Sequence, residues 1–289
     1  MDALSVPANM TERDYSVARG VRIHPFAVVD PAARLGMNVQ VGPFCIIGPD
    51  VEVEDGARLI SHVVLDGHTR IGADAVLYPF ATVGMAPQDL KYRGEPTCTE
   101  IGARTELREH VTVHRGTATG RGITRIGSDC MLMVASHVAH DCQLGNGVMV
   151  ANNVVMGGHV SIGDSAVIGG AAAIHQFVRI GRAAMIGGVS GVVTDVIPFG
   201  TVLGNRARLA SLNVIGLRRR GFSHDQIARL RAAFKLMFRG PGVFAQRVEQ
   251  ARAGYGDDAL VAEVLGFIDA PSKRGLMRAT GVGTEHDEA

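Results

Sequence analysis

Aliphatic side chains recur at every sixth position over most of this chain. One unbroken run of isoleucine, valine and leucine extends from Ile23 to Val83, and a second extends from Ile126 to Val192 with Met156 as its one exception. A period of six residues fits neither an α-helix nor an alternating β-strand. It fits a chain that turns a corner every six residues and points one aliphatic side chain per hexad into a narrow interior. The rhythm therefore predicts a parallel β-helix in which three hexads make one triangular coil.

The composition agrees with such an interior and restricts the possible classes of function. The 289 residues include 37 glycines, which suit tight corners, and no tryptophan, which a narrow prism could not hold. The formal net charge of +1 gives no general attraction for nucleic acid. Four cysteines without a CxxC spacing indicate a reducing compartment, and the sequence shows neither a signal-peptide core nor a membrane span. We therefore expect a cytoplasmic protein with no nucleic-acid partner and no stable membrane insertion.

The rhythm divides the chain into three parts. We expect a polar N-terminal extension over residues 1–20, a β-helix over 21–204, and a helical domain with a loose tail over 205–289. Within the β-helix the rhythm lapses over residues 85–99 and 117–125, which are polar and rich in turn residues. Both segments should leave the coils as loops, and loops on a rigid scaffold often carry binding residues.

The C-terminal part has helical patterns and a concentration of positive charge. Ser223 and Gln226 have the spacing of a capping box before a helical apolar pattern, and Gly240 should end that helix. Two further helices are expected over residues 243–252 and 258–268. Residues 205–240 contain nine lysines and arginines against one acidic residue. This basic segment is either a solvated helix face or a binding surface for an anionic partner.

Several histidines should stack on one side of the β-helix. Counted in coils of three hexads, Asp141 lies one coil from His159 and Gln176 lies two coils from His140. The expected ladder contains His137, His140, His159 and His175. A lone histidine is usually structural, whereas a stacked group of them is a stronger candidate for a functional site.

Two chemistries could use this ladder. Neutral imidazoles can bind zinc and leave one position open for water, and His137, His140, Asp141 and Cys142 fall within six residues. Side chains this close together at a strand corner point in divergent directions, however. The alternative is general-base catalysis, in which His140 takes a proton from a hydroxyl while the adjacent Asp141 holds it in one tautomer. We favour the general base.

The individual segments carry a resemblance to a known family. The matching stretches are HVVLDGHTRIG (62–72), QDLKYRGEPT (88–97), VTVHRGT (111–117), IGSDCMLMVASHVAHDC (126–142), IHQF (174–177), IGGVSGV (186–192) and GLRRRGFS (216–223). In these the chain resembles the acyl-[acyl-carrier-protein]–UDP-N-acetylglucosamine O-acyltransferases, which begin lipid A biosynthesis. The resemblance implies a left-handed parallel β-helix followed by a helical domain, assembled as a homotrimer. It also implies transfer of a long 3-hydroxyacyl group from acyl carrier protein to the glucosamine 3-hydroxyl of UDP-N-acetylglucosamine. No resident cofactor is implied, because phosphopantetheine arrives on the carrier protein.

The same resemblance implies a role for individual residues. His140 matches the general base, Asp141 its orienting carboxylate, and Gly158 a backbone N–H that stabilises the oxyanion. The implied substrate contacts are Gln88, Asp89, Lys91, His137, His159, His175 and Gln176, with Asn213, Arg219 and Arg220 at the nucleotide and its phosphates. Gly188 matches the position at which the family measures the acyl tail, and its lack of a side chain implies a long chain. Ile215 departs from the family pattern, which commonly has a glutamate there.

Three other functions fit part of the pattern. The sister N-acyltransferase of the same pathway is built on the same β-helix, but the QDLKY and HRGT segments favour the O-acyltransferase. A zinc carbonic anhydrase shares the architecture, and metal analysis would identify it. A purely structural solenoid would have no need of the polar segments at 85–99 and 117–125.

Overall fold

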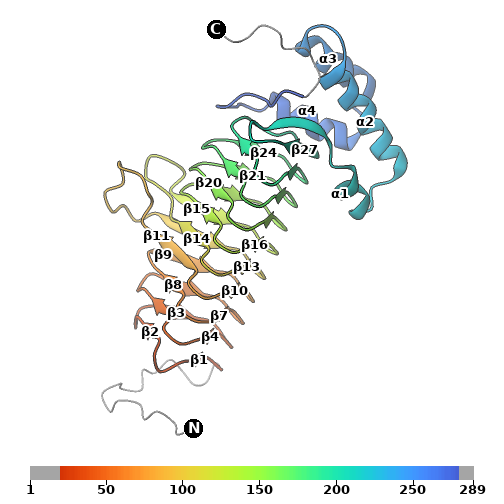
Figure 1. Cartoon of the computed structure of the whole chain (residues 1–289). Helices are drawn as coiled ribbons and strands as arrows, with labels where there is room; N and C mark the ends of the chain where they lie inside the picture. Colours follow the sequence, from red (N-terminus) through yellow and green to blue (C-terminus); the bar gives the residue numbers. More distant parts are fainter. Residues whose placement is uncertain (1–19, 280–289) are drawn as a thin grey trace. The chain divides into compact units, whose positions relative to one another are not determined.

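The computed structural model of the chain describes residues 20–279 and confirms a parallel β-helix followed by helices (Figure 1). The chain divides after Gly147 into two compact units. The extension expected over residues 1–20 lies outside the described residues except for Gly20, and so do residues 280–289 of the expected tail. Among residues 20–279 there is no helix long and apolar enough to cross a membrane.

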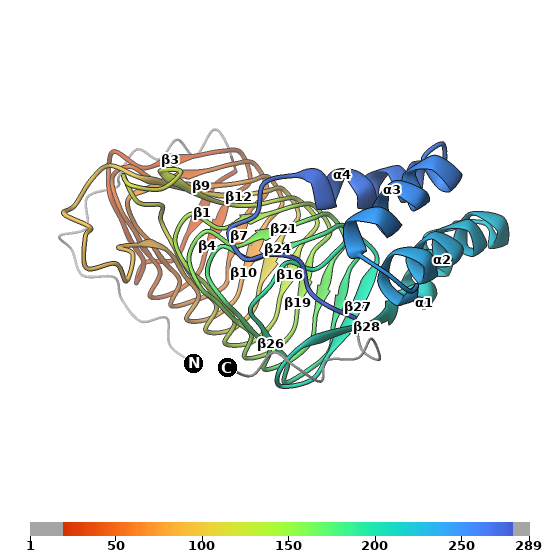
Figure 2. The same ribbon diagram turned by 90° about the horizontal axis from the view of Figure 1, so that it is seen from above.

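Three parallel sheets form the sides of the coils in the first unit, and Figure 2 shows β4, β7 and β10 following one another along one side. The first sheet contains β1 (Arg22–Ile23), β4 (Gln40–Val41), β7 (Arg58–Leu59), β10 (Val76–Leu77), β13 (Glu106–Leu107) and β16 (Met131–Leu132). The second contains β2 (Val28–Val29), β5 (Ile46–Ile47), β8 (Val64–Leu65), β11 (Thr82–Met85), β14 (Thr112–His114) and β17 (His137–Val138). The third contains β3 (Arg34–Leu35), β6 (Glu52–Val53), β9 (His68–Ile71), β12 (Cys98–Ile101), β15 (Ile123–Ile126) and β18 (Gln143–Leu144).

The sixfold rhythm of the sequence sets the register of these sheets. Most strands have only two residues, and the second of them is the aliphatic residue of the hexad. Leu65, Leu77 and Leu132 are completely buried at this position, whereas the first residue of each strand faces outward. Because neighbouring strands pair three hexads apart, as Gln40 with Arg58, like residues stack along the interior. The aliphatic stack is therefore the core of the unit.

Two loops interrupt this register in the first unit. The step between paired strands grows to Val76 with Glu106 and then to Glu106 with Met131. The loops cover residues 86–97 and 115–122, and both project on the same side of the unit (Figure 1). They are shorter at their C-terminal ends than the expected 85–99 and 117–125, because β12 and β15 begin early and pair with each other over four residues.

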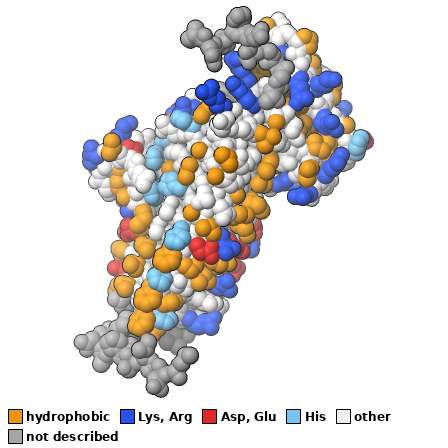
Figure 3. Space-filling view, in the orientation of Figure 1, with side chains coloured by type: hydrophobic (Ala, Val, Ile, Leu, Met, Phe, Trp, Pro, Cys, Tyr) orange, Lys and Arg blue, Asp and Glu red, His pale blue; other side chains and the backbone are white. Residues whose placement is uncertain are grey.

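A ladder of stacked rings runs along one corner of the first unit. Neighbouring rings from Phe44, His62, Phe80 and His110 have centroids 4.8–4.9 Å apart. Each of these residues has a positive φ at the corner between a strand of the first sheet and the next strand of the second sheet. Phe44 and Phe80 are about half exposed, and Figure 3 shows hydrophobic and histidine side chains alternating along this edge. Stacking between rings offsets part of the strain of a left-handed backbone at a non-glycine residue.

The second unit continues the same repeat and ends in a hairpin. Its sheets contain β19 (Met149–Val150), β22 (Val167–Ile168), β25 (Met185–Ile186), β27 (Gly200–Leu203) and β28 (Arg208–Leu212); β20 (Val155–Met156), β23 (Ala173–Ile174) and β26 (Gly191–Val192); and β21 (Ser161–Ile162) and β24 (Arg179–Ile180). The last pair, β27 and β28, is antiparallel. Because β27 also pairs with β25, this hairpin forms the end of its sheet. No feature of the hexad pattern predicts it.

Four helices follow within the described residues: α1 (Val214–Arg219), α2 (His224–Arg239), α3 (Phe244–Tyr255) and α4 (Ala259–Asp269). The predicted capping box is present, since the Ser223 side chain accepts from the Gln226 N–H and the Gln226 side chain accepts from the Ser223 N–H. The sequence did not indicate α1, which has six residues. Helix α4 is tied to a coil of its own unit by Arg182, whose guanidinium makes a two-pronged bond to Glu263.

Candidate active site

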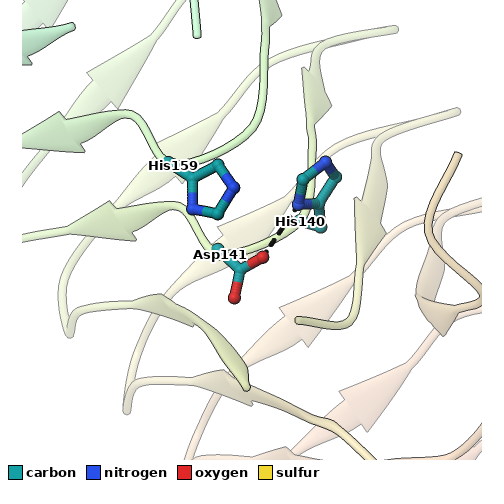
Figure 4. A group of neighbouring side chains, drawn as sticks. All are labelled: His140, Asp141 and His159. Carbon is teal, nitrogen blue, oxygen red and sulfur yellow. Dashed lines mark hydrogen bonds and ion pairs between the residues drawn. The ribbon is translucent and has the colours of Figure 1, made fainter. Parts of the chain in front are cut away.

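His140 and Asp141 form a hydrogen-bonded pair on the turn after β17. The His140 Nδ1 and the Asp141 Oδ2 are 2.8 Å apart, and Figure 4 shows the two side chains facing each other. Asp141 takes the positive-φ position of this turn, a conformation that aspartate tolerates better than most residues. Its side chain is completely buried, whereas the His140 side chain is 14% exposed. The turn therefore presents the imidazole and buries the carboxylate behind it.

The loop of residues 115–122 surrounds the Asp141 carboxylate. The Thr117 hydroxyl donates to Oδ2 at 2.6 Å, and the backbone N–H groups of Arg121 and Gly122 donate to Oδ1 at 2.7 and 3.1 Å. The loop approaches so closely at Gly120 that any Cβ there would overlap the carboxylate. This part of the chain is rich in glycine because its backbone has to come close to the acid.

These donors keep Asp141 ionised. Burial alone would raise its pKa, but the hydrogen bonds from His140, from the Thr117 hydroxyl and from backbone N–H groups outweigh burial and lower the pKa to about 2. An ionised carboxylate at Nδ1 favours the tautomer in which His140 carries its proton there. The basic lone pair then lies on Nε2, and a base so arranged can remove a proton from a hydroxyl at neutral pH.

Two more histidines lie beside this pair. The His137 Nδ1 is 2.7 Å from the Thr112 hydroxyl, and its ring meets the ring of His114 edge-on with centroids 4.8 Å apart. Burial and the neighbouring His140 lower the pKa of His137. Burial, His137 and His140 lower the pKa of His114 to about 4. Both rings are therefore neutral at pH 7, so neither of them adds a positive charge beside the candidate base.

The loop of residues 86–97 carries three of the expected substrate contacts, Gln88, Asp89 and Lys91. The Asp89 carboxylate accepts the Lys91 backbone N–H at 2.9 Å, which shapes the loop tip. Gln88 and Lys91 are exposed, and Leu90 between the two charged residues is 96% exposed. The structure thus holds these polar groups at the surface of a tied loop, where a ligand can reach them.

In the second unit, the expected site residues lie at the corners after β20 and β23. The Gly158 carbonyl accepts the Phe177 N–H at 3.0 Å, and the His159 ring stacks on the Phe177 ring with centroids 4.5 Å apart. His175 and Gln176 immediately precede Phe177. Gly158, His159, His175 and Gln176 therefore form one local group within this unit.

Gly188 lies exposed in the second unit, on the corner after β25. A Cβ at Gly188 would meet the Gly170 carbonyl oxygen at 3.2 Å, so a side chain there would be held tightly over the surface. The use of this position as a limit on acyl-chain length stays a prediction.

The three residues expected at the nucleotide surround α1. The Asn213 side chain caps α1 by accepting the Gly216 N–H at 3.0 Å and donates to the Ala183 carbonyl at 3.0 Å. Arg220 donates to the Ser165 carbonyl at 2.6 Å, and burial together with Arg182 lowers its pKa. Arg219 is exposed and makes no side-chain hydrogen bond within the described part of the chain. Asn213 and Arg220 thus also support the fold, whereas Arg219 is available to a ligand.

A basic pocket of about 460 Å³ lies between α1 and α2 in the same unit. Its lining residues are Arg218, Phe222, His224, Ile227, Ala228 and Arg231. The predicted basic segment therefore lines a pocket with both arginine and apolar side chains, and is not only a flat solvated helix face.

Sequence reasoning missed the residues that hold Asp141. The gap in the hexad rhythm marked the loop, but Thr117, Arg121 and Gly122 act on the acid mostly through backbone N–H groups, which residue types do not reveal. The glycine-rich run from Gly116 to Gly122 was the available signal.

Comparisons with known proteins agree with this geometry. Residues 195–277 match the family described as Udp N-acetylglucosamine O-acyltransferase, domain 2, and residues 123–158 match the bacterial transferase hexapeptide family. A relative from Azorhizobium caulinodans, an acyl-[acyl-carrier-protein]–UDP-N-acetylglucosamine O-acyltransferase, is 50% identical over 90% of this chain and 99% of its own length.

Solved structures show the same fold. The structure called LpxA from Acinetobacter baumannii is 42% identical and has a TM-score of 0.84, covering 89% of this chain and 99% of that one. The UDP-N-acetylglucosamine acyltransferase from Francisella novicida is 29% identical and has a TM-score of 0.87, covering 92% and 100%. The predicted left-handed parallel β-helix with C-terminal helices is thereby confirmed. This chain is an acyltransferase that belongs to the acyl-[acyl-carrier-protein]–UDP-N-acetylglucosamine O-acyltransferase family.

Proposed function

We propose that this enzyme transfers a long 3-hydroxyacyl group from acyl carrier protein to the glucosamine 3-hydroxyl of UDP-N-acetylglucosamine, the first step of lipid A biosynthesis, with His140 as general base. The observation that carries the role of His140 is its 2.8 Å hydrogen bond to a buried carboxylate that the loop of residues 115–122 keeps ionised. A base oriented in this way needs no metal to act on a hydroxyl at neutral pH.

In the proposed reaction, the His140 Nε2 takes the proton of the sugar 3-hydroxyl while the oxygen of that hydroxyl attacks the thioester carbonyl carbon. The carbonyl oxygen becomes an oxyanion, to which we assign the Gly158 backbone N–H as donor. The C–S bond then breaks, and the imidazolium returns its proton to the leaving phosphopantetheine thiolate. Asp141 stays ionised throughout and stabilises the positive charge that His140 carries between these steps.

The substrate contacts follow the family pattern. We assign Gln88, Asp89, Lys91, His137, His159, His175 and Gln176 to the sugar and the acyl donor, and Asn213, Arg219 and Arg220 to the nucleotide. Arginine suits this task because its planar donors match phosphate oxygens. Gly188 leaves room for a long acyl chain, and the exposed position of Arg219 makes it the first candidate for the diphosphate.

The proposed partner is an acidic acyl carrier protein, which would dock on the basic pocket between α1 and α2. Attraction of this kind accelerates association and weakens as salt is added. We further propose that the enzyme works in the cytoplasm as a homotrimer, as the family resemblance implies, and that it has no resident cofactor.

A transfer assay tests the proposal directly. Purified protein is offered acyl carrier proteins of graded chain length with UDP-N-acetylglucosamine, and the product is identified by mass and by its ester or amide linkage. The parallel reaction with an acylated glucosamine acceptor tests the sister N-acyltransferase. His140→Ala should abolish transfer while the circular dichroism spectrum and the oligomeric state stay as in the wild type. Full activity of that variant would refute the role of His140, and stoichiometric zinc with hydratase activity would favour the carbonic anhydrase instead.

A further inference from the structure

The C-terminal segment, defined here as residues 272–279, lies against the turn that contains His175 and Gln176. The Arg274 Nε donates to the Gln176 backbone carbonyl at 2.8 Å, and the other end of the guanidinium contacts the His175 ring. The Lys273 ammonium lies 4.2 Å from the centroid of the Phe177 ring. Two consecutive cations thus hold a turn that lies far earlier in the chain.

The segment is itself fixed by hydrogen bonds at both ends. The Ser272 hydroxyl accepts the N–H groups of Arg274 and Gly275 at 3.0 and 2.8 Å, which turns the chain sharply before the guanidinium. The Asp195 N–H donates to the Gly275 carbonyl, and the Met277 N–H donates back to the Asp195 carbonyl, each at 2.8 Å. Met277 is buried, at 3% exposure. The position of Arg274 is therefore determined by the fold and not by a free tail.

Asp195 connects the C-terminal segment to the coils of the second unit. Its buried carboxylate accepts the Arg179 N–H at 2.8 Å and the Arg179 Nε at 2.7 Å. The Arg179 guanidinium also lies over the Phe267 ring of α4, 4.4 Å from its centroid. The segment, the last coils and α4 are thus joined through the Arg179–Asp195 ion pair, which gives the Arg274 side chain a rigid support.

Arg274 acts on a turn whose other contacts involve residues assigned to substrate. The amide after Gln176, that of Phe177, donates to the Gly158 carbonyl, and the Phe177 ring stacks on His159. The Gln176 carbonyl and the Phe177 N–H belong to the same peptide group. By binding that carbonyl, the Arg274 guanidinium therefore also fixes the N–H that donates to Gly158. Arginine has only donors, so it can hold a carbonyl and a ring nitrogen at the same time through different N–H groups.

We infer that Arg274 is a positioning residue, which fixes the His175–Gln176 turn so that these side chains meet the substrate without a loss of conformational freedom on binding. Lys273 supports the same turn through the face of Phe177. The inference rests on the proposed function, since it takes His175 and Gln176 as substrate contacts. Groups held in place before binding improve affinity because fewer rotations have to be frozen when the substrate arrives.

Steady-state kinetics of Arg274→Ala, compared with wild type and Arg274→Lys, test this inference. For Arg274→Ala we expect the KM of UDP-N-acetylglucosamine to rise about tenfold, as for the loss of one charge-assisted hydrogen bond, with a much smaller change in kcat. The midpoint of the pH profile should stay unchanged, because His140 and Asp141 are not altered. Arg274→Lys should be intermediate, since an ammonium can keep the bond to the Gln176 carbonyl but cannot also reach the ring of His175.

Hydrogen exchange gives a readout that does not depend on catalysis. Arg274→Ala should speed exchange of the Phe177 and Val178 amides, whose acceptors are the carbonyls of Gly158 and His175, and leave the amides of β22 protected. Arg58→Ala, which removes the same charge from an exposed position of β7, should change neither KM nor exchange.

The possible outcomes separate the two ideas. Wild-type KM and wild-type exchange in Arg274→Ala would overturn the positioning role even if transfer activity is found. A loss of protection throughout the second unit would also overturn it, because Arg274 would then be a general stabilising residue. An inactive wild type with faster exchange confined to the turn in Arg274→Ala would refute the proposed function while supporting the contact.

Discussion

Replacing Thr117 by valine removes one hydrogen bond to Asp141 and almost no volume. Thr117 is 2% exposed, and its hydroxyl donates to the Asp141 Oδ2 at 2.6 Å. A hydrogen bond to a charged group contributes roughly 1.5–3 kcal/mol, and its loss here leaves part of a buried carboxylate without a donor. We expect Thr117→Val to lower the free energy of unfolding by about 2 kcal/mol, or the melting temperature by roughly 5 °C for a chain of this size.

The pH dependence of this loss identifies its cause. The folded pKa of Asp141, about 2, lies below the ordinary value of 3.8, so its contribution to stability is present above pH 3.8 and disappears as the pH falls through 2. The shift corresponds to roughly 2 kcal/mol at neutral pH. Without the Thr117 hydroxyl, the pKa of Asp141 should rise toward its ordinary value. The stability difference between wild type and variant should therefore be full at pH 7 and shrink below about pH 4.

Thermal unfolding followed by circular dichroism at a series of pH values measures this stability difference. The kcat/KM of Thr117→Val should also fall about tenfold, because Asp141 then orients His140 less firmly. Thr99→Val is the matched control. Thr99 is also fully buried, on β12, but its hydroxyl has no hydrogen-bond partner among residues 20–279, so its replacement should be neutral or slightly stabilising. Equal effects of the two substitutions, or a loss for Thr117→Val that does not depend on pH, would refute the reasoning.

Three further variants test the site. Asp141→Asn should lower kcat on the order of a hundredfold, because an amide no longer fixes the tautomer of His140; an unchanged kcat would remove Asp141 from the mechanism. His114 has a pKa of about 4 in the folded protein against 6.5 in the unfolded chain. The unfolded chain therefore binds more protons between these values, and the free energy of unfolding decreases as the pH falls from 6.5 toward 4. His114→Phe should therefore lose about 2 kcal/mol less than the wild type between pH 7 and 5, as measured by chemical denaturation. Gly188→Met should shift the preferred donor to shorter acyl chains in competition assays analysed by mass; an unchanged preference would show that Gly188 does not limit the chain.

The coils could be predicted from the sequence almost residue by residue. A period of six fixes both the inward residue and the pairing of strands three hexads apart, so Leu65 and Val83 are paired and buried as expected. The predicted capping box at Ser223 needed only local chemistry. Both kinds of prediction succeed because they depend on short-range patterns, which residue type alone reveals.

The parts that escaped prediction depend on contacts without a period. The hairpin of β27 and β28 ends its sheet by antiparallel pairing, which the hexad pattern does not predict. Arg274 contacts Gln176, which lies 98 residues earlier in the chain, and nothing in the sequence around Arg274 indicates that partner. For the site, the sequence indicated His140 and Asp141 through their adjacency, but the donors from Arg121 and Gly122 are backbone groups that every residue except proline carries.

The loop that surrounds Asp141 joins two consecutive coils, since it leaves after β14 and the acid follows β17, the paired strand. In a stacked array each repeat contacts only its neighbours, so unfolding can begin at an end and stop before the middle. Opening of the first coils, around β1 and β2, would therefore break none of the bonds that hold the carboxylate. We expect the His140–Asp141 hydrogen bond to survive unfolding that starts at the N-terminal end until the coil of β14 itself unfolds.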